Sequence, residues 1–304
     1  NDQENELLPG NTRSNTGEIY APQRIADEML EFVSKNKKQP FFLYYPTVLP
    51  HLPLQAPKED IEEYKGLWPE TPYNGRSYQP HPTPRACYAA MISFLDKQIG
   101  RLMALLKNLN LDRNTIVMFT SDNGSTHLRS QVDYDFFDSV GPLRGLKGSL
   151  YEGGIRFPFI AHWPGKIKFD QQSDHLAANY DLLATIAEIV DVQITMDTDG
   201  TSFLPLLLGK PEDQKIPPYL FWDFAGYGGQ MAVRMGKWKG IKRDLRKKDK
   251  VTFELYNLEE DIGETNNVTS QHPEIAAKIE QIILRERVMP TTKGFQFGTY
   301  ADKS

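Results

Sequence analysis

Apolar residues recur at helical spacing in two segments of the first third of the chain. The first predicted helix follows Pro22, and these apolar side chains fall on one of its faces: Ile25, Met29, Phe32 and Val33. A longer helix is predicted from about Pro84 to Asn108, with Thr83 as its candidate N-cap. Its wide apolar stripe comprises Tyr88, Met91, Ile92, Leu95, Ile99, Leu102, Leu105, Leu106 and Leu109. We interpret that stripe as part of a packed core.

Short continuous apolar runs alternate with these helices. They are FFLYY at 41–45, TIVMFT at 115–120 and FPFIA at 157–161. Such runs are typical of strands buried on both faces, as in a parallel sheet. A helix followed closely by a buried strand also fits the βαβ rhythm. The predicted class is therefore α/β, with a mainly parallel sheet flanked by helices.

The pattern changes beyond residue 200. The segments YLFWDF, MAVRMGKWKGIK and VTFELYNL are short and aromatic, and glycine or charged turns separate them, which favours an antiparallel sheet. An amphipathic helix, HPEIAAKIEQIILRER, closes this part. We therefore predict a larger domain over residues 1–212 and a smaller α+β domain over 213–304. The polar residues 1–18 are predicted to form a loop.

The composition of the 304 residues is that of an ordinary globular protein, with 39% hydrophobic and 25% charged residues. No run approaches the roughly 18 apolar residues of a membrane span. The net charge of −5 does not support nucleic-acid binding, and the basic run at 242–250 is more simply a solvated loop than an anion patch. The single cysteine, Cys87, excludes an internal disulfide and a cysteine-rich zinc site.

Candidate chemistry lies directly after the predicted strands, where open α/β sheets carry their active sites. The sequence SDNG follows TIVMFT, so that Asp122 and Asn123 offer one charged and one neutral oxygen on a sharp turn. Such oxygens suit a hard cation such as calcium. The same three letters, Asp-Asn-Gly, also form ordinary turns, and only their position after a buried strand favours the metal interpretation.

Two further candidates are His51 and Lys147. Prolines flank His51 at the end of the run 41–45, and its imidazole suits proton donation to a departing oxygen or contact with a sulfuryl or phosphoryl oxygen. Lys147 lies between glycines in GLKG, where the backbone can approach an oxyanion and the ammonium can neutralise developing charge. The spacing is not that of a P-loop. A structural histidine and a solvated lysine are the alternatives.

Weaker candidates surround these residues. His127 follows SDNG closely and is expected to face the same cleft, and His81 lies in a proline-rich loop. Arg144, Glu152 and Arg156 flank the glycine-rich segment, and we interpret them as ion pairs that support it.

The order of these segments and their residues resemble one family, the type I sulfatases of the alkaline-phosphatase-like superfamily. PFFLYYPTVLPHLPLQAP is similar to their strand and histidine segment. The run from YAAMISFLDKQIG to VMFTSDNG resembles their long helix and metal strand, and GPLRGLKGSLYEGGIRFPFIAHWPGKI resembles their lysine and glycine segment. DGTSFLPLLLGK, MAVRMGKWKGI and LYNLEEDIGETNNV resemble their C-terminal domain.

The resemblance implies roles for the candidate residues. Asp122 and Asn123 would be two ligands of Ca²⁺, with Mg²⁺ as an alternative metal. Lys147 would bind a sulfate oxygen, His51 would lie near the leaving oxygen and His127 would contact the substrate. The reaction implied is hydrolysis of the sulfate ester of a carbohydrate or an aryl alcohol, and the partner implied is a sulfated small molecule or glycan. A secreted or periplasmic location is expected from the resemblance alone.

The sequence departs from the family pattern at the nucleophile. In the family, a formylglycine hydrate made from the cysteine or serine of a C-x-P-S-R motif attacks sulfur, but Cys87 stands in RACYAA. The paired Asp-Asp of an early strand is not found either. We therefore expect an N-terminal segment of the same protein to supply these groups, and the chain alone to be inactive and prone to aggregate. Two alternatives stay open: a phosphonate or phosphate ester hydrolase of this superfamily, and a non-catalytic glycan- or calcium-binding protein.

Overall fold

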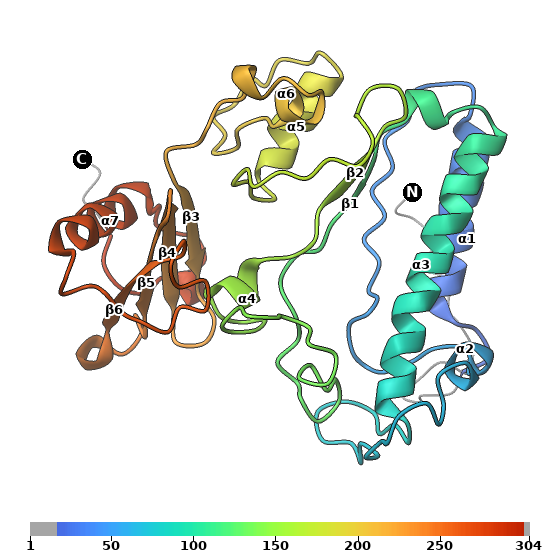
Figure 1. Cartoon of the computed structure of the whole chain (residues 1–304), viewed down its shortest axis with the longest axis horizontal. Helices are drawn as coiled ribbons and strands as arrows, with labels where there is room; N and C mark the ends of the chain where they lie inside the picture. Colours follow the sequence, from blue (N-terminus) through green and yellow to red (C-terminus); the bar gives the residue numbers. More distant parts are fainter. Residues whose placement is uncertain (1–16, 301–304) are drawn as a thin grey trace. The chain divides into compact units, whose positions relative to one another are not determined.

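The computed structural model describes residues 17–300, so nearly all of the predicted loop 1–18 lies outside the described residues. The described residues form two compact units (Figure 1). The first extends to Ile116 and includes Leu128–Phe137. The second comprises Val117–His127 and the chain from Asp138 onward. The predicted boundary between residues 212 and 213 stays a prediction.

Helices make up the regular structure of the first unit. They are α1 Ala21–Asn36, α2 Lys58–Glu62, α3 Pro84–Asn108 and the 3₁₀ turn η1 Asp112–Asn114. Helix α1 packs beside α3 (Figure 1), and the ring of Tyr20 meets that of Phe94 edge to face at 5.0 Å. Both long helices are confirmed. Thr83 occupies the N-cap position of α3, but its side chain makes no capping hydrogen bond.

The buried face of α3 differs in detail from the predicted stripe. Met91 and Leu95 are buried as expected, and Cys87 is a core side chain. Ile92, however, is 44% exposed, whereas Gln98 is buried. The helix therefore turns a face centred on residues 87, 91 and 98 toward its neighbours. Periodicity located the helix but misplaced its buried side at Ile92.

The predicted strand at 41–45 is not formed. Within residues 17–300, this segment is extended without a strand partner, and Phe42 and Tyr44 are 69% and 76% exposed. The prediction of burial on both faces was wrong here. A strand is defined by its ladder of backbone hydrogen bonds, and an apolar run alone does not supply the neighbour.

The second unit contains two antiparallel sheets. The smaller one pairs β1 Val117–Phe119 with β2 Ile160–His162, with Met118 opposite Ala161. The predicted apolar runs around 115–120 and 157–161 thus do contain strands. Their pairing is antiparallel, however, and no parallel pair occurs among residues 17–300. Short helices accompany this sheet: α4 Glu152–Ile155, α5 Asp181–Ile189, α6 Leu204–Leu207 and η2 Pro211–Asp213.

The larger sheet confirms the antiparallel prediction for the C-terminal part. Its strands follow chain order: β3 Leu220–Phe224, β4 Gln230–Met235, β5 Trp238–Arg243 and β6 Thr252–Asn257. The turns η3 Lys248–Lys250 and η4 Lys293–Phe295 and the helix α7 Pro273–Glu286 complete the unit. Helix α7 covers one face of the sheet (Figure 1).

Glycine at one position of β5 lets α7 approach the sheet closely. A Cβ on Gly240 would lie 2.6 Å from Cγ2 of Ile279, which is fully buried on α7. Complete burial of an isoleucine side chain stabilises a fold by about 1.5–3 kcal/mol. Met231, Val233 and Leu255 pack in the same core.

Candidate functional site

The predicted metal residues lie in the loop that leaves β1. Ser121 Oγ donates to the carbonyl of Asn123 (3.2 Å), and the side chain of Asn179 donates to the carbonyl of Ser121 (3.0 Å). Asn123 Nδ2 donates to the carbonyl of Gly124 (3.0 Å). This hydrogen bond orients the amide, and within residues 17–300 Oδ1 of Asn123 has no hydrogen-bond partner beside the exposed Asp122.

The glycine-rich loop at 144–154 lies against this turn. The backbone N–H of Lys147 donates to the carbonyl of Ser125 (2.7 Å), and that of Gly124 donates to the carbonyl of Gly154 (3.0 Å). A Cβ on Gly124 would lie 2.0 Å from the carbonyl oxygen of Gly153. The close approach therefore requires glycine at position 124, and it brings Asp122, Asn123 and Lys147 into one group of adjoining loops.

Three polar side-chain groups of these loops have no partner among the residues that the structure describes. Within residues 17–300, the structure gives neither the Lys147 ammonium nor the Asp122 carboxylate a hydrogen bond or ion pair. The hydroxyl of Ser125 is buried without a hydrogen-bond partner. A buried polar atom without a partner costs about 1–3 kcal/mol, which a ligand that hydrogen-bonds to it would recover. The ammonium and the hydroxyl suit an oxyanion, and the carboxylate and amide oxygens suit a hard metal ion.

The donor set fits a metal only in part. Calcium takes six to eight oxygen ligands, whereas Asp122 and Asn123 offer two groups. Among residues 17–300, no set of three or more His, Cys, Asp or Glu side chains is arranged to hold a metal. These residues therefore fit as two ligands of a site whose remaining ligands come from elsewhere.

A buried ionic cluster holds the glycine-rich loop in place. Lys239 on β5 is fully buried, and its ammonium contacts Oε1 of Glu152 (2.7 Å) and of Glu264 (3.1 Å). Glu264 also accepts the backbone N–H of Glu152 (2.7 Å). Arg144 donates to the hydroxyl of Tyr256 (3.0 Å) and to the carbonyl of Glu264 (2.6 Å). The ion-pair interpretation is confirmed for Glu152 and Arg156, which are 2.5 Å apart, whereas Arg144 supports the loop through hydrogen bonds.

The pKa values within this cluster diverge. Burial raises the pKa of Glu152, but the charges of Lys239 and Arg156 outweigh it and hold that pKa below its ordinary value. Burial also raises the pKa of Glu264, and there it prevails over the opposing effect of Lys239. The two carboxylates contact the same ammonium, but the pKa of Glu152 is lowered and that of Glu264 is raised.

His127 and Tyr227 form an exposed aromatic pair beside the same loop. Their ring centroids are 5.8 Å apart at an interplanar angle of 83°, and Oη of Tyr227 lies 3.5 Å from Nε2 of His127. A Cβ on Gly148 would meet the Tyr227 ring at 2.5 Å. His127 is therefore joined to the glycine-rich loop through Tyr227. Sequence reasoning missed Tyr227, although the flanking glycines in AGYGG were a signal for a turn that presents an aromatic ring.

His51 belongs to the first unit. Its backbone N–H donates to the carbonyl of Val48 (2.7 Å), and Nδ1 pairs with the carbonyl of Leu52 (2.7 Å). Because a carbonyl only accepts, Nδ1 carries a proton, and Nε2 is the nitrogen available to a ligand. The exposed ring meets that of Tyr78 edge to face at 6.3 Å. His81, by contrast, is a buried structural residue, and burial lowers its pKa.

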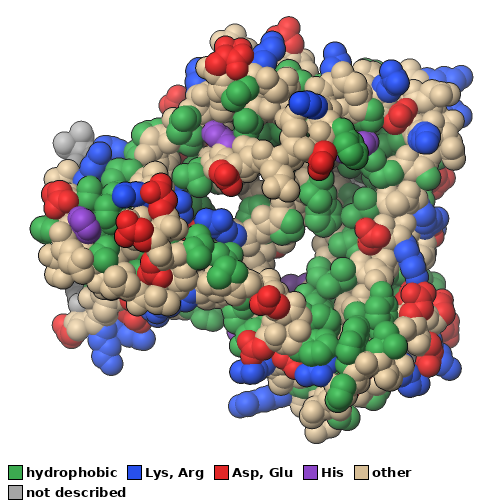
Figure 2. All heavy atoms as spheres, viewed as in Figure 1, with side chains coloured by type: hydrophobic (Ala, Val, Ile, Leu, Met, Phe, Trp, Pro, Cys, Tyr) green, Lys and Arg blue, Asp and Glu red, His purple; other side chains and the backbone are tan. Residues whose placement is uncertain are grey.

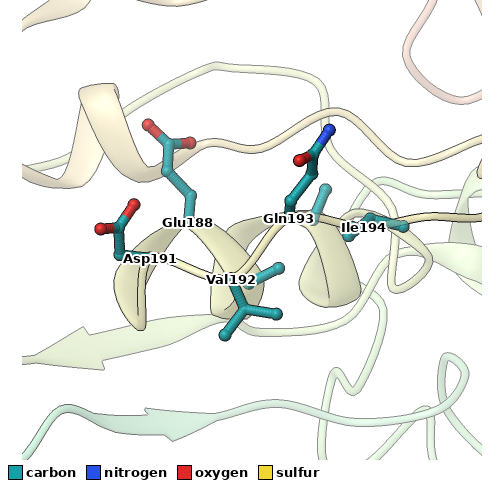
Figure 3. A pocket seen from close by; sticks show the side chains of 7 residues that line it. Glu188, Asp191, Val192, Gln193 and Ile194 are labelled. Atoms are coloured by element: carbon teal, nitrogen blue, oxygen red, sulfur yellow. The ribbon is translucent and has the colours of Figure 1, made fainter.

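Two open cavities occur elsewhere on the described surface. One, of about 440 Å³, lies at the end of α5, where Glu188 and Asp191 line it together with the segment that follows (Figure 3). None of the predicted site residues borders it. The other, of about 520 Å³, lies between Pro53 and the loop at 74–80. Across the face shown in Figure 2, acidic and basic side chains are interspersed.

Comparison with known families identifies the chain. Residues 2–192 match the family model described as Sulfatase. The chain belongs to the sulfatase family. Residues 146–289 of this sulfatase chain also match the model described as N-sulphoglucosamine sulphohydrolase, C-terminal. No helix among the described residues is long and apolar enough to cross a membrane.

Curated relatives extend beyond this sulfatase chain. An N-acetylgalactosamine-6-O-sulfatase of Bacteroides thetaiotaomicron is 30% identical over 276 residues, which cover 85% of this chain and 49% of that protein. The N-acetylgalactosamine-6-sulfatase of Mus musculus is 30% identical over 230 residues, which cover 74% of this chain and 39% of the mouse protein. The chain thus spans about half or less of the length of these relatives.

Solved structures support the same assignment. Ps i-CgsB in complex with k-i-k-neocarrahexaose superposes with a TM-score of 0.72 at 26% identity, covering 89% of this chain and 55% of that one. A structure determined with D-glucosamine-2-N,6-O-disulfate has a TM-score of 0.68 at 19% identity, over 91% of this chain and 70% of that one, which shows the fold alone. The sulfatase chain therefore has a mixed α/β fold of the alkaline-phosphatase-like class.

Proposed function

We propose that the enzyme containing this chain hydrolyses sulfate esters of glycans, and that the chain supplies its anion- and metal-binding residues. One observation carries the proposal: the loop of Lys147 is bonded through its backbone to the Asp122–Asn123 turn, and among the described residues neither the Lys147 ammonium nor the Ser125 hydroxyl has a partner. The sulfatase family and the N-acetylgalactosamine-6-sulfatase relatives support a sulfated carbohydrate as the substrate.

Lys147 would bind a sulfuryl oxygen and stabilise the negative charge that develops there. Asp122 and Asn123 would hold Ca²⁺, or Mg²⁺, through their free oxygens. Such an ion, when bound, polarises the sulfuryl oxygens as a Lewis acid. His127 would contact the sugar from the edge of the same loops.

His51 would protonate the leaving oxygen. With Nδ1–H held by the carbonyl of Leu52, a proton gained at Nε2 is the one the imidazolium can give away. The two contacts of His51 with its own turn fix the direction of that nitrogen.

The nucleophile is proposed to come from a segment outside these 304 residues, as a formylglycine. Cys87 is unsuitable because burial raises its pKa to about 12 and the side chain has no exposed surface. We expect the 304-residue chain alone to leave aryl sulfates intact. Secretion or export to the periplasm is proposed from the family resemblance.

The test uses the protein expressed at the full length of its gene. We expect turnover of N-acetylgalactosamine 6-sulfate, with kcat lowered about 10²–10³-fold by Lys147→Ala, the range found when one charge-stabilising donor is removed. Lys166→Ala, which removes an exposed lysine of the same unit, is the matched control and should keep full activity.

Two results would contradict the proposal. Preferential turnover of a phosphonate monoester would favour the phosphoesterase alternative. Retained sugar binding without turnover of either ester would favour a non-catalytic glycan-binding protein.

A further inference from the structure

The loop between Tyr73 and His81, called here the Arg76 loop, is closed and rigid. The backbone N–H groups of Tyr73 and His81 each donate to the other's carbonyl at 2.9 Å. Gly75 has a φ of +80°, and a Cβ there would lie 3.1 Å from Cδ of Pro80. Only glycine adopts this conformation readily, so the loop has one well-defined shape.

A buried hydroxyl organises the loop from inside. Oη of Tyr73 accepts the backbone N–H groups of Arg76 (2.6 Å) and Ser77 (3.1 Å), and it also accepts Nε2 of Gln131 (2.7 Å). Tyr73 and Gln131 are 7% and 3% exposed. Three hydrogen bonds to this hydroxyl thus hold the backbone at residues 76 and 77, while Arg76 itself is exposed.

The loop borders a cavity next to His51. The cavity of about 520 Å³ is lined by the loop and by Pro53, two residues beyond His51. Tyr78, which also lines it, meets the His51 ring edge to face at 6.3 Å. The cavity and the proposed proton donor therefore share a wall within the first unit.

Among the residues that the structure describes, Arg76 is the only charged one that lines this cavity. Within residues 17–300, its guanidinium has no hydrogen bond or ion pair. A rigid polar cavity with one unpaired guanidinium and no carboxylate selects for an anion, and guanidinium binds carboxylate or sulfate with two parallel hydrogen bonds.

We propose that the Arg76 cavity binds a second acidic group of the glycan, which is a carboxylate or a further sulfate. This group would lie near the sulfate ester whose leaving oxygen His51 is proposed to protonate. The inference rests on the proposed function and narrows its substrate class to glycans with at least two anionic groups. Arg76 is then a residue that determines specificity, and the reaction itself does not depend on it.

Calorimetric titration of the protein expressed at the full length of its gene, with its nucleophile replaced by alanine to prevent turnover, tests this with three probes. N-acetylgalactosamine 6-sulfate carries one anionic group, D-glucosamine-2-N,6-O-disulfate carries a second sulfate, and N-acetylgalactosamine 6-sulfate linked to a hexuronic acid carries a carboxylate. We expect at least one dianionic probe to bind about ten-fold more tightly than the first, and the one that does identifies the second group. Arg76→Ala should remove that gain, and Arg76→Lys should restore only part of it.

Arg113→Ala is the matched control because it removes an exposed arginine of the same unit that does not line the cavity. Equal affinities for all three probes, or a gain that survives Arg76→Ala, would overturn the inference. Lys147→Ala separates it from the proposed function, since it should weaken all three probes alike. If Lys147→Ala changes none of them while Arg76→Ala removes the gain, the sulfate-binding role of Lys147 fails and the anion-binding cavity stands.

Discussion

Replacing Lys239 with methionine removes a cation that contacts two buried carboxylates, Glu152 and Glu264. Lys239 and Glu264 have no exposed side-chain surface, and that of Glu152 is 5% exposed. Methionine retains most of the volume of the lysine stem, so the change isolates the lost charge. Removal of one partner from a buried ion pair costs about 3–5 kcal/mol when the charge left behind is uncompensated. This applies to Glu264, since Glu152 keeps the contact with Arg156 at 2.5 Å. We expect a loss of that size in the free energy of unfolding.

The same strand offers a matched control. Lys242 pairs with Glu280 at 2.8 Å, but the two side chains are 28% and 47% exposed, so solvent screens the pair. Lys242→Met should therefore cost at most about 1 kcal/mol. Urea unfolding followed by tryptophan fluorescence measures both variants, since Trp222 and Trp238 lie in the sheet.

The pH dependence provides a second criterion. Without Lys239, burial of Glu264 is no longer opposed by that cation, and its folded-state pKa rises further above the unfolded value, whereas Arg156 still opposes burial at Glu152. A raised carboxylate pKa destabilises the fold increasingly as pH rises through it. The deficit of Lys239→Met should thus be larger at pH 8 than at pH 5. A deficit no greater than that of Lys242→Met, or one independent of pH, would refute the reasoning.

Three further predictions concern other parts of the chain. Gly100 lies on α3 with nothing within 4 Å of an added Cβ, so Gly100→Ala should raise the free energy of unfolding by about 0.5–1 kcal/mol. A Cβ on Gly154 would lie 2.2 Å from the carbonyl oxygen of Ser149, so Gly154→Ala should lower that free energy by about 1–3 kcal/mol. Urea titrations in which both variants change it with the same sign would count against the structure. Cys87, with its pKa raised to about 12 by burial, should not react with Ellman's reagent at pH 8 until the chain is unfolded, and rapid labelling of the folded chain would be inconsistent with its burial. The exposed rings of Phe42 and Tyr44 should make the isolated chain aggregate. Replacing both with serine should increase the monomer fraction measured by light scattering. An unchanged fraction would show that another surface causes the aggregation.

The spacing of apolar residues correctly predicted the elements whose formation depends mainly on their own sequence. Helices α1, α3 and α7 and the meander β3–β6 form where apolar periodicity placed them, because each element buries one face that its own sequence defines. The segment at 41–45 shows the limit. Its apolar residues are typical of a strand, but strand pairing depends on a neighbouring segment, which the residues at 41–45 do not specify.

The site shows a similar division. The sequence predicted that the SDNG turn and the glycine-rich loop carry the chemistry, and the structure joins them through backbone hydrogen bonds at Gly124 and Lys147. It did not predict the burial of Lys239, which within KWKGIK resembles a solvent-facing lysine until Glu152, 87 residues earlier, comes into contact with it. The hydroxyl of Tyr73 was missed for the same reason, since its partner Gln131 is 58 residues away. The catalytic roles of His51 and Lys147 stay predictions.

Coupled titration of calcium and sulfate tests the central claim most directly, namely that Asp122, Asn123 and Lys147 serve one metal and one anion together. If they do, saturating sulfate should lower the Kd for calcium of the protein expressed at the full length of its gene, and calcium should tighten sulfate binding by the same factor. Asp122→Ala should abolish calcium binding, and Lys147→Ala should abolish the coupling. Calcium affinity that is the same with and without sulfate, or that is unchanged by Asp122→Ala, would contradict the account.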